Sequence, residues 1–250
     1  MTRTSAWRGW GSDASLSTLL VMQVLTLFVV VPLGAGHPSG RMLHSACDLA
    51  FAAVSAVALT RHRAVRGALL GALALLLVAT SSVARPWGAR VGLDAGVEHE
   101  IVALVALAFN ALVTALVARR VFGPGRVTAH RVQGAVLLYL NVAALFAILY
   151  GVLDAHAPGA FASAGNATMD SRPGMRPATL TYFSLVTITT TGYGDLAPLH
   201  PLARSLANLE AVFGQLFPAT LLARLVALHL AQHEPAPVSA RTGAGDARPS

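Results

Sequence analysis

The chain has 250 residues, of which 55% are hydrophobic and 12% charged, and its formal net charge at pH 7 is +7. Soluble domains carry about 25% charged residues, so this composition excludes a single water-soluble core and indicates a multi-spanning membrane protein. All 18 basic residues are Arg. They lie in short segments between apolar runs, which is typical of membrane proteins rather than of a nucleic-acid-binding face, so no nucleic acid partner is expected.

Six apolar runs are long enough to cross a lipid bilayer as helices, because a span needs about 20 mostly apolar residues. Breaks rich in Gly, Pro and Arg separate them, and such breaks are typical of turns. The six runs are residues 16–33, 43–60, 65–83, 100–118, 132–153 and 202–230. We interpret the first run as a retained anchor helix, because no clear small-residue cleavage site follows it.

A seventh apolar run, residues 178–190, is too short to span the bilayer and fits a re-entrant helix. The predicted fold is therefore an all-α integral membrane protein. It has six transmembrane helices, with the re-entrant helix between the fifth and the sixth. Residues 1–131 form an N-terminal four-helix transmembrane domain, residues 132–233 form a second domain, and residues 234–250 form a disordered tail.

The direction of the spans follows from the distribution of Arg. With the N-terminus inside, the predicted inner segments hold nine Arg and the first two outer loops hold three, which favours cytoplasmic termini. The inner residues are Arg3, Arg8, Arg61, Arg63, Arg66, Arg119, Arg120, Arg126 and Arg131, and the outer ones are Arg41, Arg85 and Arg90. Residues 154–201 then face outward, and we expect the long stretch 156–177 to be a loop.

The segment Thr190-Thr191-Gly192-Tyr193-Gly194 directly follows the short apolar run. Backbone carbonyl oxygens can replace the water around a dehydrated cation when successive residues alternate between ordinary and left-handed conformations. Gly192 and Gly194 suit the left-handed positions, because glycine adopts them at little steric cost. We expect Tyr193 to point away from the ion and pack against the preceding helix, and the Thr190 hydroxyl to lie at the inner mouth.

Residues on both sides of this segment are expected to support it. The C-terminus of the short helix carries a partial negative charge that favours a cation beneath it. Tyr182 and Phe183 are predicted to brace the segment from behind. Asp195 is predicted either to tie the segment to the short helix or to concentrate cations at the outer mouth.

Residues 189–195, Thr-Thr-Thr-Gly-Tyr-Gly-Asp, resemble the signature of potassium channels, with Thr191 where Val is most common. The resemblance covers about residues 132–230, and it makes residues 132–233 a pore domain with outer helix, pore helix, selectivity filter and inner helix. It implies a homotetramer in a lipid bilayer that conducts K⁺, because a filter needs four strands around one axis and each chain supplies one. The resemblance is to bacterial six-helix channels.

The last span carries a second set of candidate residues. Gly214 lies twenty residues after Gly194 and resembles the hinge glycine of the family, although close helix packing is an alternative explanation. Pro218 lacks a backbone N–H and is predicted to kink the helix. Gln215, Pro218 and Leu222 fall near one face, where they are expected to line a cavity.

Charged residues within the spans allow more than one interpretation. Glu210 either pairs behind the filter or near Arg204, or lies high enough to be wetted from outside. Glu98, His99 and Glu100 suggest an interfacial cluster, with Asp48 near an interface or paired with Arg. A metal or proton site from Asp48, His99 and Glu100 is less favoured, because the spacing is not that of HExxH. If the His faces outside, the protein is expected to be pH-sensitive.

The fourth span lacks the feature that makes a voltage sensor. Voltage-gated potassium channels, which share the six-span arrangement, carry Arg at every third position there. Residues 101–118 carry no charge, and Arg119 and Arg120 lie only at the inner end. Each sensing charge is worth about 2.3 kcal/mol per 100 mV, so we expect weak or absent voltage dependence.

Three functions other than a potassium channel are alternatives for this sequence. A cation channel that does not discriminate K⁺ from Na⁺ would use the same architecture, and Thr191 is the deviation that invites it. A potassium uptake subunit usually repeats the pore unit four times, whereas this chain has one. An enzyme is not expected, since the sequence shows no nucleophile elbow, zinc motif or plausible carboxylate pair, and it implies no cofactor.

Overall fold

The computed structural model describes residues 6–35, 43, 46–47, 50–55, 95–123, 129–163 and 175–233. The predicted second span lies partly within these ranges, and its described residues are helical. The predicted third span, residues 65–83, and the predicted tail, residues 234–250, lie outside the described residues.

Four helices of the described part are long and apolar enough to cross a membrane. The first is a continuous run through α1 (Ala6–Leu25), the π-helical turn η1 (Thr26–Val30) and α2 (Val31–Gly34). The other three are α6 (Ala95–Val121), α7 (Ala129–His156) and α9 (Pro201–His233). They correspond to the predicted first, fourth, fifth and sixth spans. Each helix extends beyond its apolar run, because backbone hydrogen bonding continues into flanking residues that carry no apolar signal.

The short helix α8 (Met175–Ile188) lies between α7 and α9 in the sequence. Its 14 residues span about 21 Å, which is less than the roughly 30 Å of a bilayer core. It begins three residues before the predicted run and ends two residues before the end of that run. Pro177 in the first turn is compatible with the earlier start, because the first helical N–H groups have no partner within the helix.

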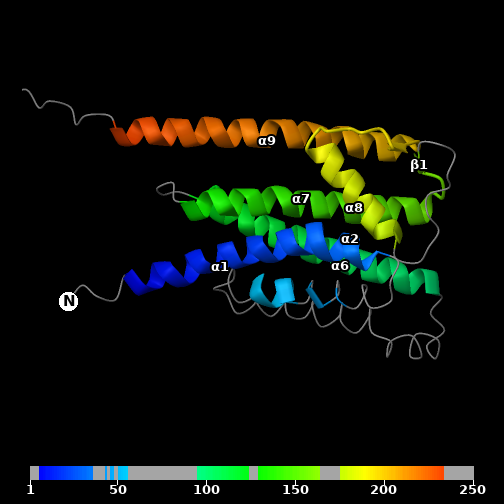
Figure 1. Ribbon diagram of the computed structural model, residues 1–250, viewed down its shortest axis with the longest axis horizontal. Helices are drawn as coiled ribbons and strands as arrows, with labels where there is room; N and C mark the ends of the chain where they lie inside the picture. Colours follow the sequence, from blue (N-terminus) through cyan, green and yellow to red (C-terminus); the bar gives the residue numbers. More distant parts are fainter. Residues whose placement is uncertain are drawn as a thin grey trace, which may run out of the picture.

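Helix α7 occupies the centre of the described structure. It packs against α1 and α6 on one side and against α8 and α9 on the other (Figure 1). Helix α8 runs obliquely across α7 and reaches α9. The buried apolar core follows these contacts and includes Leu19 of α1, Val113 of α6, Leu137 of α7 and Leu180 of α8.

A two-stranded antiparallel sheet was not predicted. Strand β1 (Phe161–Ser163) pairs with β2 (Leu196–Pro198), with Phe161 opposite Pro198. The backbone N–H groups of Leu199 and His200 also donate to the carbonyl of Ala160. The prediction of a plain loop over residues 156–177 is therefore wrong for its described part, and the segment after residue 195 is fixed to the chain that follows α7.

Helix α9 packs closely on the end of α8 at Gly214. A Cβ atom added to Gly214 would lie 1.9 Å from the carbonyl oxygen of Ile188, so only glycine fits. The same oxygen accepts a hydrogen bond from the Tyr139 hydroxyl of α7 at 2.7 Å. This contact favours the packing explanation for Gly214. The sequence predicts a kink of α9 at Pro218. The helix continues through Pro218 without a break (Figure 1), because the missing N–H removes only one backbone hydrogen bond.

The packing at Gly214 gives a stability prediction. Gly214→Ala should lower the stability of the detergent-solubilised protein by about 1–3 kcal/mol, because the added methyl group meets backbone that cannot move aside. Gly151→Ala in α7 is the matched control, since its Cβ would lie 4.0 Å from Leu180 Cδ1, an ordinary contact. Thermal unfolding of both variants tests this, and equal midpoints would contradict the packing role.

Candidate functional site

Helix α8 ends in a backbone motif that places Thr190 in the left-handed region, with φ 57°. The N–H of Thr190 donates to the carbonyl of Thr187, and the N–H of Thr191 donates to the carbonyl of Val186, both at 2.9 Å. These two bonds and the left-handed residue form a Schellman motif, in which glycine is usual. The residue that caps α8 is thus also the first residue of the candidate filter.

Left-handed residues then recur at every second position of the segment. After Thr190, Gly192 has φ 56° and Gly194 has φ 77°. The intervening residues, Thr191 and Tyr193, are not in the left-handed region. The conformation predicted for the two glycines is therefore present. The left-handed Thr190 was not predicted, because a β-branched residue rarely adopts positive φ.

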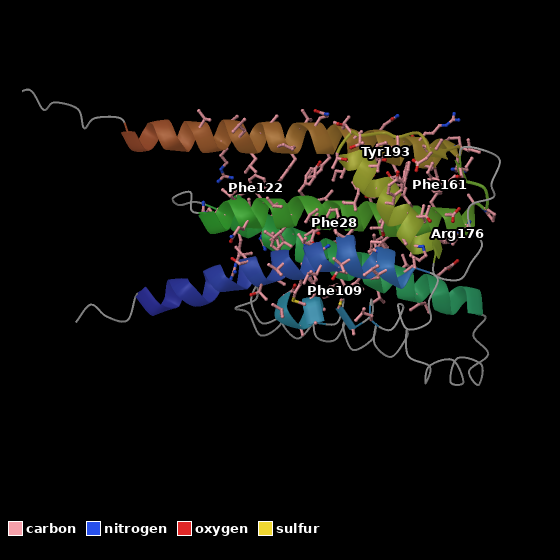
Figure 2. The ribbon with its side chains drawn as sticks, viewed as in Figure 1. Phe28, Phe109, Phe122, Phe161, Arg176 and Tyr193 are labelled. Carbon is pink, nitrogen blue, oxygen red and sulfur yellow. The ribbon has the colours of Figure 1, made fainter. Side chains whose placement is uncertain are left out.

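The candidate filter segment is exposed on the surface of the single chain. Residues 189–195 are all exposed, and the Tyr193 ring is 71% exposed (Figure 2). The expected packing of Tyr193 against the preceding helix is therefore absent within one chain. A large ring left uncovered in an apolar protein is suited to contact with another molecule.

The two residues expected to brace the segment behave differently. The Tyr182 hydroxyl donates to Asp195 Oδ2 at 2.8 Å, so the predicted contact between Asp195 and the short helix is present. Phe183 is buried and packs edge-on against the rings of Tyr150 and Phe161. Adjacent helical residues point about 100° apart, so Tyr182 and Phe183 point in different directions from α8.

Gln215 of α9 contacts the candidate filter directly. Its Nε2 donates to Thr190 Oγ1 at 2.8 Å, and that hydroxyl donates to the carbonyl of Thr189. The prediction placed Gln215 in the cavity wall without this contact. Gln215, Pro218 and Leu222 are all exposed in the single chain, and the last is 63% exposed.

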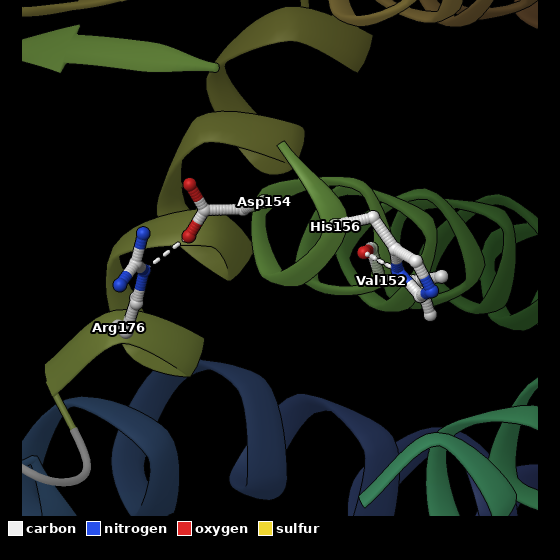
Figure 3. Close-up of polar contacts among 4 residues, drawn as sticks. All are labelled: Val152, Asp154, His156 and Arg176. Atoms are coloured by element: carbon white, nitrogen blue, oxygen red, sulfur yellow. Dashed lines mark hydrogen bonds and ion pairs between the residues drawn. The ribbon is translucent and has the colours of Figure 1, made fainter. Parts of the chain in front are cut away.

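Three polar contacts lie near the start of α8 and the end of α7. Arg176 at the start of α8 pairs with the buried Asp154 at the end of α7 (Figure 3). The hydrogen bond from this contact raises the pKa of Arg176 above its usual range, so the side chain stays charged. His156 Nδ1 contacts the carbonyl of Val152 at 2.8 Å (Figure 3), and its Nε2 lies 3.0 Å from Glu100 Oε1 of α6.

The remaining charged candidates are only partly accounted for. Glu210 is fully buried and contacts Ser184 of α8, so the wetted interpretation is wrong and the pairing behind the filter fits. Arg204 donates to the carbonyl of Pro198 rather than to Glu210. Asp48 and the side chains of Glu98 and His99 lie outside the described part. Within the residues searched, no group of three His, Cys, Asp or Glu side chains could hold a metal ion.

Comparison with known proteins bears directly on this site. A sequence model of the ion channel family matches residues 135–229, which include α8, the left-handed segment and most of α9. The matched segment makes up less than half of the chain, and it is this segment that is similar to the ion channel family. Ion channels are transport proteins, so this agrees with the prediction that the chain is not an enzyme, and the resemblance to potassium channel pores is supported.

Two relatives match different lengths of the chain. The inward rectifier potassium channel Kirbac3.1 of Paramagnetospirillum magnetotacticum is 38% identical over 79 residues, which are 32% of this chain but only 23% of that protein. Protein LctB of Bacillus caldotenax is 27% identical over 129 residues, which are 52% of this chain and 95% of that protein. No solved structure matches significantly.

The contact between Tyr182 and Asp195 is open to a direct test. Tyr182→Phe and Asp195→Asn should each lower stability by about 0.5–1.5 kcal/mol, the usual net value of one hydrogen bond. If the contact accounts for both losses, the double variant should lose little more than either single variant. Thermal unfolding of the four proteins measures the coupling, and strictly additive losses would contradict the contact.

Proposed function

We propose that this chain is a subunit of a potassium-selective channel and that four copies assemble around residues 190–194. The observation that carries the proposal is the alternation of left-handed residues at Thr190, Gly192 and Gly194 in an exposed segment. Such a backbone turns successive carbonyl oxygens to one side, where four strands can replace the hydration shell of K⁺. The similarity to Kirbac3.1, an inward rectifier potassium channel, also favours K⁺.

The exposed surfaces of the single chain support a tetramer. One chain supplies one strand, and a ring of carbonyl oxygens requires several. Tyr193 is 71% exposed, and large apolar side chains of α9 such as Leu209, Val212 and Leu216 are each more than half exposed. Neighbouring copies and lipid would cover these groups.

The wider proposal keeps the roles expected from the sequence. Helix α8 is the re-entrant pore helix, α9 is the inner helix, and both termini lie in the cytoplasm. Gln215, Pro218 and Leu222 line the cavity, and their exposure in the single chain fits that role. Movement of α9 at Gly214 is compatible with its close packing only if α8 and α9 separate or slide at Ile188.

Conduction and selectivity can be tested with the purified protein in liposomes. The wild type should pass K⁺, be blocked by Ba²⁺ and show a reversal potential that follows the K⁺ gradient. Gly192→Ala should abolish flux, because φ 56° is strained for any residue with a Cβ.

Gly159→Ala is the matched control, since Gly159 also has positive φ, 87°, with nothing within 4 Å of an added Cβ, but lies outside the segment. It should retain K⁺ flux. A reversal potential that ignores the K⁺ gradient would favour a non-selective cation channel, and loss of flux in both variants would contradict a specific role for residue 192.

Voltage should have little effect on the conductance. Helix α6 carries Arg119 and Arg120 in its last turn, and residues 101–118 of the helix are uncharged. Moving uncharged sequence through the membrane field does no electrical work. Planar-bilayer recordings over a wide voltage range should show that the conductance depends only weakly on voltage. Steep activation by voltage would contradict this part of the proposal.

A further inference from the structure

Glu210 occupies a fully buried position at the meeting point of three helices. It belongs to α9, its Oε1 contacts Ser184 Oγ of α8, and its Oε2 accepts a hydrogen bond of 2.6 Å from the Tyr150 hydroxyl of α7. Both of these partners are neutral hydroxyl groups. A buried carboxylate without a cation is costly, so the state of this carboxyl group has to be explained.

The hydrogen atoms available at this cluster decide that state. Ser184 Oγ lies 2.7 Å from the backbone carbonyl of Ala143 as well as in hydrogen-bonding contact with Glu210. A carbonyl oxygen can only accept, and a serine hydroxyl has one hydrogen to give. Three contacts thus need three hydrogens, whereas the Ser184 and Tyr150 hydroxyls bring two.

We propose that Glu210 is a neutral carboxylic acid that supplies the third hydrogen and positions the pore helix between the two helices that flank it. In this arrangement Ser184 donates to Ala143, the acid donates from Oε1 to Ser184, and Oε2 accepts from Tyr150. Every polar atom of the cluster then has a partner. An ionised Glu210 would leave one contact between two oxygens without a hydrogen.

The position of these contacts explains why the loss of the Glu210 side chain would alter the filter. Glu210 contacts Ser184, and one helical turn further along both helices Gly214 packs on Ile188. The two contacts fix α8 along the last turn before the Thr190 cap. Glu210 is therefore a positioning residue that acts through α8, and this functional part of the inference rests on the proposed channel function.

Infrared difference spectroscopy of the wild type against Glu210→Gln tests the protonation state without any need for conduction. At neutral pH the difference should show the C=O band of a protonated carboxylic acid, present in the wild type and absent from the variant. Carboxylate bands in its place would overturn the proposal.

Flux measurements in liposomes test the positioning role. Glu210→Gln should retain K⁺ flux, because its amide donates to Ser184 and accepts from Tyr150 as the acid does. Glu210→Ala should lower flux by about tenfold or more, since it leaves the buried Tyr150 hydroxyl without an acceptor and removes the contact between α9 and Ser184. Comparable losses in both variants would overturn the role, whereas absence of flux in the wild type would overturn the channel function and leave the infrared result standing.

Discussion

The left-handed conformation of Thr190 is the constraint on which the rest of the site depends. A β-branched residue at φ 57° costs about 1–2 kcal/mol, so its surroundings must hold it there. Two backbone bonds of the Schellman motif end α8 at this residue, and Gln215 of α9 donates to its hydroxyl. The end of α8 and the beginning of the alternating segment are thereby set by one residue, and Gly192 and Gly194 continue the pattern at lower cost.

Helix α8, which Thr190 caps, is held in place by three contacts. Its start is held by the pair between Arg176 and Asp154, its middle by Glu210, and its end by the contact of Ile188 with Gly214. All three contacts join α8 to α7 or α9. A short helix of 14 residues buries little surface by itself, so these contacts determine where the segment after it lies.

Apolar length and glycine spacing predicted much of this arrangement. The long helices, the short α8 and the left-handed Gly192 and Gly194 follow from hydropathy and from the conformational freedom of glycine. The pairing of β1 with β2 could not be predicted, because it joins three-residue segments far apart in sequence. The partners of Glu210 and the burial of Phe183 depend on how helices rotate against one another, which helical periodicity alone does not determine.

The central claim is that the carbonyl oxygens of residues 190–194 take the place of water around a K⁺ ion. Anomalous diffraction from crystals of the assembled protein grown in Rb⁺, which resembles K⁺ in size and charge, tests it most directly. Rb⁺ peaks should lie in a row on a four-fold axis, each surrounded by backbone carbonyl oxygens of this segment. An assembly whose axis holds no Rb⁺ beside residues 190–194, or one in which side chains alone bind the ion, would contradict it.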